Sequence, residues 1–378
     1  WDVTEVENAN DTVATGRFQE NVYVNAVIIV SEGQVRTAWV WDLDEDQTIG
    51  SGYNFNWTLT NYEDVYPYLG TWSQWQIQQY LIDGINVRVI GDLTLTGDLY
   101  IPEGTILQVE GSLYDGTSAA ADDHFAINGN GTLRVRNDFT VYSGVINVNT
   151  QVGDTLGDDL LLGANTTINS RVGVYGDIIG NTVNSGTGHS ANRGFNLTVG
   201  TGGSVYANRD VEVYYLTVNG HIEANDYHIK GGEVNSARTL IALGSITLYG
   251  GELKLGDTAT GNATVNGKIS GTGDLNVNDG TLTLTRSGSI NLVGDVSVGS
   301  KGTITQLNGT THHIVVDGNA YINGKVTIPG TIKATGDVYF GSTANVTLVG
   351  DPTGATVTKD PNPKVTIIGG GTDIPEVP

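Results

Sequence analysis

A short phrase of alternating polar and apolar residues recurs along the second half of the chain. Each copy begins with a Gly-Asp or Gly-Asn pair and continues with alternating apolar side chains, at 273–277, 294–298, 318–322 and 336–340. The intervals between the four glycines are 21, 24 and 18 residues (273 to 294, 294 to 318, 318 to 336). A period of two is typical of a β-strand with one buried face, and glycine permits a sharp corner.

Short strands, tight corners and a repeat of about 21 residues predict a solenoid whose coils stack strand upon strand. We therefore expect an all-β chain folded as a parallel β-helix, right-handed because parallel β-crossovers almost always are. The coils should occupy residues 85–350, which makes about twelve coils at ~4.8 Å per coil. Two polar stretches, 111–128 and 180–194, are predicted to be loops that interrupt the coils.

Residues 1–84 lack the repeat and are predicted to form an aromatic-rich cap. Segments 22–30 and 35–41 alternate around a turn, which predicts a hairpin. Segment 66–84 predicts a short helix, with Ser73 as N-cap, Gln76 completing a capping box and Gly84 as the C-terminal stop. Because an open first coil exposes its core and its strand edges, we expect this hairpin and helix to cover it.

The composition changes again after Gly350, where five of the eight prolines fall in 351–378. Because proline cannot donate to a strand ladder, we expect one closing strand at 365–368 followed by a Gly- and Pro-containing tail. The sequence thus predicts three parts: a cap at 1–84, a solenoid at 85–350 and a C-terminal strand and tail at 351–378.

The charge of the chain narrows its possible partners. Lys and Arg number 18 against 41 Asp and Glu, a formal net charge of −23. Nucleic acid is excluded as an expected partner, since phosphate binding needs a basic surface. A neutral glycan fits this charge better than an acidic one. No apolar run is long enough to insert directly into a membrane.

The chain contains no cysteine and no methionine. Disulfides, thiolate metal sites and cysteine nucleophiles are therefore excluded, and nothing is readily oxidised at sulfur. This composition suits a protein exposed outside the cell. The first residue is Trp1 rather than Met, so we expect a processed or excised fragment.

The acidic segment 42–46 suggests calcium, because alternate carboxylates in a loop can converge on one ion. The candidate ligands are Asp42, Asp44 and Asp46. An EF-hand is excluded, since Gln47 and Tyr53 stand where its glycine and its glutamate are required. A solvated acidic loop is the favoured interpretation, with a looser structural Ca²⁺ site as the alternative. We expect no other cofactor.

Short segments similar to the catalytic motifs of polygalacturonases occur in the same order along the chain. They are Asn149-Thr150-Gln151, Asp158-Asp159, Gly188-His189-Ser190 and His228-Ile229-Lys230. Gln151 cannot replace a catalytic carboxylate, and His228 cannot replace an arginine that holds a uronate. Asp158 and Asp159 are adjacent, so on a strand they would point to opposite faces. We therefore expect no enzymatic activity.

All six tryptophans precede the predicted solenoid: Trp1, Trp39, Trp41, Trp57, Trp72 and Trp75. One interpretation is that they fill the cap. The other is that they stack on sugar rings, because an indole offers a large flat apolar face. The two interpretations do not exclude each other. The candidate sugar-binding residues are Trp39, Trp41, Trp57 and Trp72.

Tyrosines recur at the spacing of one coil. Tyr206, Tyr227 and Tyr249 follow one another at 21 and 22 residues, while Tyr321 and Tyr339 occupy the same slot of the repeated phrase. This spacing predicts a ladder of outward rings at ~4.8 Å, which could hold an extended polymer or simply stabilise neighbouring coils. The stabilising interpretation is favoured for Tyr227. The other four tyrosines are candidate binding residues.

As a whole the chain resembles the C-terminal part of a tapirin, one of the cellulose-adhering surface proteins of thermophilic plant-degrading bacteria. The resemblance is architectural: an aromatic-rich non-repeat start, a β-helix, no cysteine and no catalytic set. It implies cellulose as the ligand, a place at the cell surface, and a pilus or cell-surface anchor through regions outside this sequence. We thus expect a non-catalytic extracellular adhesin. The alternatives are a structural surface or filament subunit and, less favoured, a polysaccharide hydrolase or lyase.

Overall fold

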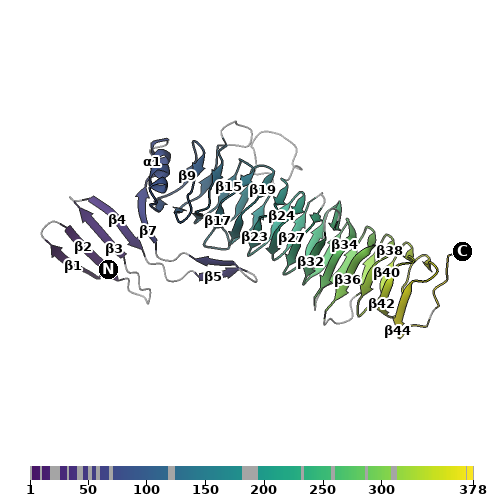
Figure 1. Cartoon of the computed structure of the whole chain (residues 1–378). Helices are drawn as coiled ribbons and strands as arrows, with labels where there is room; N and C mark the ends of the chain where they lie inside the picture. The colour runs from purple at the N-terminus through teal and green to yellow at the C-terminus, as the bar shows by residue number, and fades with distance from the viewer. Residues whose placement is uncertain are drawn as a thin grey trace. The chain divides into compact units, whose positions relative to one another are not determined.

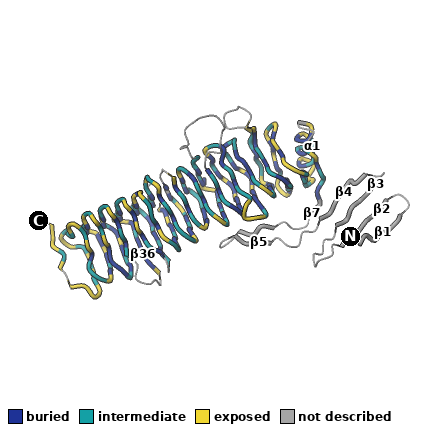
Figure 2. The backbone as a smooth tube through the Cα atoms, turned by 180° about the vertical axis from the view of Figure 1, so that it is seen from behind, coloured by how far each residue is buried: buried dark blue, intermediate teal, exposed yellow. Residues whose placement is uncertain are grey.

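The computed structural model divides residues 1–378 into two compact units, and each unit is described by itself. Unit 1 is Trp1–Asp177 with Tyr206–Asn208, and unit 2 is Ile178–Val205 with Arg209–Pro378. For residues 1–61 the structure describes only the backbone of the strands β1 to β7, whose bounds are given below. From Tyr62 onward it describes side chains except at 68–71, 118–123, 181–194, 231–233, 235, 257–259, 286–287, 308–312, 372 and 378 (Figures 1 and 2).

The N-terminal part of unit 1 is antiparallel. Its strands are β1 (Asp2–Asn8), β2 (Asp11–Arg17), β3 (Ala26–Ser31), β4 (Gln34–Val40), β5 (Asp46–Ile49), β6 (Tyr53–Asn56) and β7 (Thr60–Val65). Strands β1, β2, β3, β4 and β7 pair in that order, and β5 pairs with β6. The β3–β4 pair is the predicted hairpin, and β7 pairs in parallel with β8, the first strand of the solenoid.

The helix α1 (Thr71–Ile82) follows, and the rest of unit 1 is coiled. Each coil repeats three strand positions, and strands at one position pair in parallel with those of a neighbouring coil (Figure 1). We call the three runs of strands the first, second and third sheet. The first sheet holds β8 (Val87–Val89), β11 (Ile106–Val109), β14 (Thr132–Val135), β17 (Asn149–Val152) and β20 (Arg171–Val174). The second holds β9 (Leu93–Thr94), β12 (Leu113–Tyr114), β15 (Phe139–Val141) and β18 (Leu160–Leu162). The third consists of two separately paired runs, β10 (Leu99–Tyr100) with β13 (Ile127–Asn128) and β16 (Val145–Ile146) with β19 (Thr166–Ile168).

Unit 2 repeats the same three-strand coil. Its first sheet holds β26 (His221–Ala224), β29 (Thr239–Ala242), β32 (Gly261–Val265), β39 (Lys325–Thr327), β42 (Asn345–Val349) and β44 (Lys364–Ile368), and β23 (Ser204–Ala207) lies across the boundary of the units. Its second holds β21 (Ile178–Ile179), β24 (Val211–Val213), β27 (Tyr227–Ile229), β30 (Ile246–Leu248), β33 (Lys268–Gly271), β35 (Ser289–Leu292), β37 (Ile314–Val316) and β40 (Ile332–Ala334). Its third holds β22 (Leu197–Val199), β25 (Leu216–Val218), β28 (Val234–Ser236), β31 (Glu252–Leu255), β38 (Ala320–Ile322), β41 (Val338–Phe340) and β43 (Val357–Lys359). The long strands β34 (Asp274–Leu284) and β36 (Val296–Gln306) serve both the third and the first sheet.

The predicted fold class is confirmed: the chain is all-β and forms a parallel β-helix, with about 13 turns over the two units. The right-handed coil stays a prediction. The three-part division at 84/85 and 350/351 also stays a prediction, since the compact units divide elsewhere.

The core is a set of aliphatic stacks that run from coil to coil. In unit 1, Val87, Leu107 and Leu133 pair in register on β8, β11 and β14, and all three are fully buried. The next position of the stack is Thr150, whose hydroxyl donates to the carbonyl oxygen of Val148 at 2.9 Å. Alternate residues of each strand point inward, so a modest apolar content suffices for a dry core (Figure 2).

The corners of the coils are joined by side-chain hydrogen bonds. The Asp274 carboxylate accepts from the backbone N–H of Asp295 at 2.7 Å, and the Asp295 carboxylate accepts from the N–H of Asn319 at 2.6 Å. The Asn319 amide oxygen accepts from the N–H of Asp337 at 2.9 Å, and Asp337 accepts from Thr356. The four acceptors, Asp274, Asp295, Asn319 and Asp337, are the second members of the repeated Gly-Asp and Gly-Asn pairs. The phrase is therefore a clamp between successive coils.

The glycine of each pair leaves room for the preceding clamp. A Cβ at Gly294 would overlap the carboxylate oxygen of Asp274, and a Cβ at Gly318 would overlap that of Asp295. Neither glycine has a positive φ, so close approach explains its presence and backbone strain does not. The corner thus needs glycine for space and the following Asp or Asn for its acceptor.

The C-terminal end of unit 2 contains the predicted closing strand as β44, together with β43, which the sequence did not predict. The tail returns along β43, where the N–H of Lys359 donates to the carbonyl oxygen of Pro375 at 3.0 Å. Val365 and Ile367 face inward on β44 and remain partly exposed, whereas their partners Val346 and Leu348 are fully buried.

We predict that Gly318→Ala lowers the free energy of unfolding by about 1–3 kcal/mol, because the new methyl group overlaps the Asp295 carboxylate and the Gly294 carbonyl. Gly157→Ala is the matched control, since its Cβ would meet only the Thr155 hydroxyl at 3.8 Å. The control should change stability by less than about 0.5 kcal/mol. Denaturant unfolding of both variants checks this, and equal stability of the two would contradict the steric account of the phrase.

Candidate functional site

Helix α1 buries one face on the first coil and exposes the other. Ile77 and Leu81 are completely buried, and Ser73 and Gln74 lie on the same buried side. Trp72 and Trp75 are 58% and 54% exposed. The helix therefore presents its largest apolar side chains to solvent, although burying an indole would stabilise the fold.

Two glutamines hold α1 against the open edge of the first coil. The Gln74 amide oxygen accepts from the backbone N–H of Thr96 at 2.5 Å, and its nitrogen donates to the carbonyl oxygens of Gly97 and Asp98. The Gln78 amide accepts from the N–H of Tyr100 at 2.8 Å and donates to the Tyr100 carbonyl oxygen at 2.9 Å. Each glutamine side chain thus satisfies backbone N–H and carbonyl groups that a neighbouring strand would otherwise bond.

The ends of α1 agree with the sequence only in part. The predicted N-cap is wrong: the helix begins at Thr71, so Ser73 lies inside it, and the Ser73 hydroxyl donates to the Tyr66 carbonyl oxygen at 2.8 Å. The predicted stop is confirmed, since Gly84 has a φ of 77° and the N–H of Ile85 donates to the Tyr80 carbonyl oxygen.

The exposed rings on α1 form a stacked pair. The ring centroids of Trp72 and Trp75 lie 5.0 Å apart at an interplanar angle of 30°. Residues three apart share one helix face, so the pair follows from the sequence spacing. Tyr66 and Tyr100, 49% and 50% exposed, belong to the segments that flank the helix and that its side chains bind. We call Trp72, Trp75 and Tyr100 the aromatic ridge.

The predicted tyrosine ladder is only partly present. Tyr321 and Tyr339 pair in register on β38 and β41, as predicted. Tyr227 is buried and pairs with Ile246 on β30, so it does not stack on Tyr249. The prediction from the 21- and 22-residue spacing was wrong because the coils differ in length. Tyrosines equally spaced in the sequence therefore do not occupy equivalent positions in successive coils.

The candidate tyrosines differ in exposure and in partners. Tyr249 is 53% exposed and Tyr321 is 41% exposed. Tyr206 is half-buried, with the Arg171 guanidinium 5.8 Å from its ring centroid. The Tyr339 hydroxyl donates to the Asp360 carboxylate, and this hydrogen bond raises the pKa of Tyr339.

Tyr249 belongs to a small mixed cluster on unit 2. The Lys230 ammonium lies 4.8 Å from the Tyr249 ring centroid and 3.2 Å from a carboxylate oxygen of Glu212. Tyr214 and Tyr215 pack edge to face with centroids 4.7 Å apart. Because the lysine already carries a carboxylate partner, this cluster offers a weaker apolar platform than the aromatic ridge.

A row of threonines also faces outward on the first sheet of unit 2. Thr264, Thr283, Thr305, Thr327, Thr347 and Thr366 pair in register from β32 to β44. Cross-strand threonine pairs stabilise a sheet. We assign this row that structural role.

Several predicted residues lie outside the described side chains. Trp39, Trp41 and Trp57 are among them, as are the candidate calcium ligands Asp42, Asp44 and Asp46. Asp46 is placed only as the first residue of β5. Among the side chains that are described, no group of three or more His, Asp or Glu is arranged to hold a metal ion. The calcium site stays a prediction.

Among the residues that resemble polygalacturonase motifs, Asp158 and Asp159 have structural partners. The Asp158 carboxylate accepts from the backbone N–H groups of Asp154 and Thr155 and closes a loop. The Asp159 carboxylate accepts from the N–H of Asp177 at 2.8 Å and is a corner clamp. His189 lies outside the described residues. The expectation of no enzymatic activity stays a prediction.

On β26 the half-buried His221 lies close to the buried Glu223, and we consider this pair as a candidate for proton chemistry. His221 Nε2 lies 3.9 Å from a carboxylate oxygen of Glu223, whose side chain is almost completely buried. Burial lowers the pKa of His221, although the nearby carboxylate opposes this shift. A polymer chain cannot reach Glu223, so the pair is structural.

The lowered pKa of His221 predicts a pH dependence of stability. Because the unfolded chain takes up the proton first as pH falls, the free energy of unfolding decreases below the ordinary histidine pKa of about 6.5. His221→Gln removes this contribution. The wild type should therefore lose more stability than the variant between about pH 7.5 and about pH 5. Denaturant unfolding measures the difference, and identical slopes for the two proteins would refute the assignment.

No family model, curated protein or solved structure matches this chain. The resemblance to tapirins therefore stays an expectation. The described residues also contain no helix that combines the length and the apolar character needed to cross a bilayer.

Proposed function

We propose that the chain is a non-catalytic extracellular protein that adheres to an insoluble neutral polysaccharide, with cellulose as the ligand to test first. The observation that carries the proposal is the exposed, stacked pair Trp72 and Trp75 on a helix fixed to the solenoid. Pyranose rings have flat C–H faces that pack on indole rings, so such a pair forms a platform for a sugar chain. Attachment at the cell surface belongs to the same proposal.

The anchoring of α1 supports a binding role. Gln74 and Gln78 fix the helix backbone, and Ile77 and Leu81 lock its inner face. The helix backbone that carries the rings therefore needs little ordering when a ligand arrives, which reduces the entropic cost of binding. The net charge of −23 disfavours acidic glycans and leaves neutral ones.

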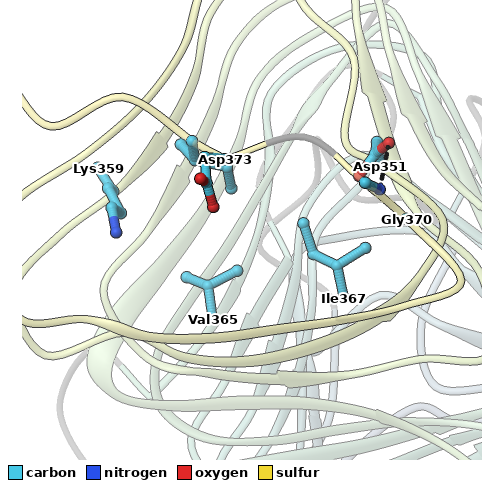
Figure 3. Close-up of a pocket in the computed structure, with 8 residues that line it drawn as sticks. Asp351, Lys359, Val365, Ile367, Gly370 and Asp373 are labelled. Atoms are coloured by element: carbon cyan, nitrogen blue, oxygen red, sulfur yellow. Dashed lines mark hydrogen bonds between the residues drawn. The ribbon is translucent and has the colours of Figure 1, made fainter.

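A structural role as a surface or filament subunit is the second candidate, and the C-terminal end of unit 2 favours it. A cavity of about 300 Å³ opens there over Val365 and Ile367, with Asp351, Lys359 and Asp373 around it (Figure 3). Val365 and Ile367 point toward the solenoid core but are left partly exposed on the last coil. Such an apolar surface is suited to a protein partner. Electron microscopy of the purified chain separates the candidates, because ordered polymers would favour the filament role.

The direct test of the proposal is binding to crystalline cellulose. We expect the wild type to be depleted from solution at both low and high salt, since stacking is not screened. Trp72→Ala/Trp75→Ala should weaken binding at least about tenfold, at about 1 kcal/mol for each ring. Tyr249→Ala/Tyr321→Ala is the matched control, because it removes two exposed rings of unit 2.

Two outcomes would count against the proposal. If the wild type is not depleted at any salt concentration, cellulose is not the ligand. If the tyrosine variant loses binding and the tryptophan variant keeps it, the binding surface lies on unit 2.

A further inference from the structure

A column of uncharged polar side chains continues from the aromatic ridge along the third sheet of unit 1. Tyr100 on β10 pairs in register with Asn128 on β13. The Asn147 amide nitrogen donates to the Asn128 amide oxygen at 2.9 Å, and the Asn169 nitrogen donates to the Asn147 oxygen at 3.0 Å. Asn147 and Asn169 directly follow β16 and β19, which pair in the same register. We call Asn128, Asn147 and Asn169 the asparagine column.

Tyr100 connects the column to helix α1, which carries Trp72 and Trp75. Tyr100 is the last ring of the ridge, and its backbone is held by Gln78 of α1 through two hydrogen bonds. It is also the direct neighbour of Asn128 in the sheet. A ligand lying on Trp72 and Trp75 could therefore extend over Tyr100 and continue coil by coil.

The amides retain unused hydrogen-bonding capacity. A carboxamide has two N–H donors and two lone pairs on its oxygen. Within the asparagine column, the Asn147 side chain uses one N–H donor toward Asn128 and one oxygen lone pair toward Asn169. The side chains of Asn147 and Asn169 are exposed, so the remaining donors and lone pairs face solvent. Each step of the column thus offers both a donor and an acceptor.

This pattern fits the chemistry of a neutral glycan. Sugar hydroxyl groups both donate and accept, and they recur at regular intervals along an extended chain. The steps of the column recur at the coil spacing of ~4.8 Å. In a chain with 41 acidic residues, the column itself carries no ionised side chain. The asparagine side chains themselves offer no cation to an acidic polymer.

We propose that the asparagine column is a binding track for an extended neutral glycan, which runs from the aromatic ridge along the stacked coils of unit 1. This inference rests on the proposed function, because the ridge supplies the stacking that starts the track. The ridge binds short oligosaccharides, and the track adds affinity only when the ligand is long enough to pass Tyr100.

Calorimetry with soluble cello-oligosaccharides of increasing length tests the track. For the wild type, affinity should rise from cellobiose to cellohexaose. Asn147→Ala/Asn169→Ala should weaken cellohexaose binding about tenfold, since two hydrogen bonds are lost, and should leave cellobiose binding unchanged. Asn291→Ala/Asn345→Ala is the control, because it removes two exposed asparagines of unit 2 and should affect neither ligand. Melting temperatures of all variants establish that they are folded.

The outcomes separate the track from the proposed function. If the asparagine variant binds cellohexaose as the wild type does, while Trp72→Ala/Trp75→Ala loses it, the track is wrong and the ridge stands. If the asparagine variant loses both ligands equally, the column supports the fold and the track is also wrong. If the wild type binds neither these ligands nor cellulose, the proposed function fails and the track fails with it.

Discussion

The hydrogen bond between a corner side chain and the backbone N–H one coil later is the constraint on which the solenoid depends. In unit 2 it runs unbroken from Asp274 through Asp295, Asn319 and Asp337 to Thr356. Asp92 and Asp138 make the same bond in unit 1. A sheet ladder alone permits slippage, whereas an acceptor fixed at each corner sets the register of the whole coil. Once the register of the strands is set in this way, the inward-facing aliphatic side chains of successive coils lie one above another.

In the first coil, β7 pairs with β8, whereas residues 96–100 are bonded by side-chain amides of α1. Gln74 and Gln78 bond backbone groups of the first coil, a task that tryptophans cannot perform because an indole has one donor and no acceptor. The glutamines therefore take positions against the coil, and Trp72 and Trp75 lie on the exposed side. The same geometry that protects the solenoid end creates the aromatic ridge.

The sequence predicted the coil well because its chemistry is local. Each Gly-Asp pair places the space and the acceptor in adjacent residues, so the corner is visible without knowledge of the fold. The tyrosine column was predicted less well, since Tyr227 and Tyr249 belong to coils of unequal length. The ridge was only partly predicted: Trp72 was named as a candidate and Trp75 was not, although the spacing of three residues was a usable signal. Which face of α1 docks depends on hydrogen bonds to residues 96–100, and local patterns do not encode that contact.

The central claim is that the exposed tryptophan pair contacts the sugar chain, and fluorine NMR tests it most directly. The protein is labelled with 5-fluorotryptophan, and the resonances of Trp72 and Trp75 are assigned with single Trp→Phe variants. The account predicts that cellohexaose shifts these two resonances together, with one saturation curve. Resonances of Trp72 and Trp75 that stay unmoved while the protein is saturated with cellohexaose would contradict it.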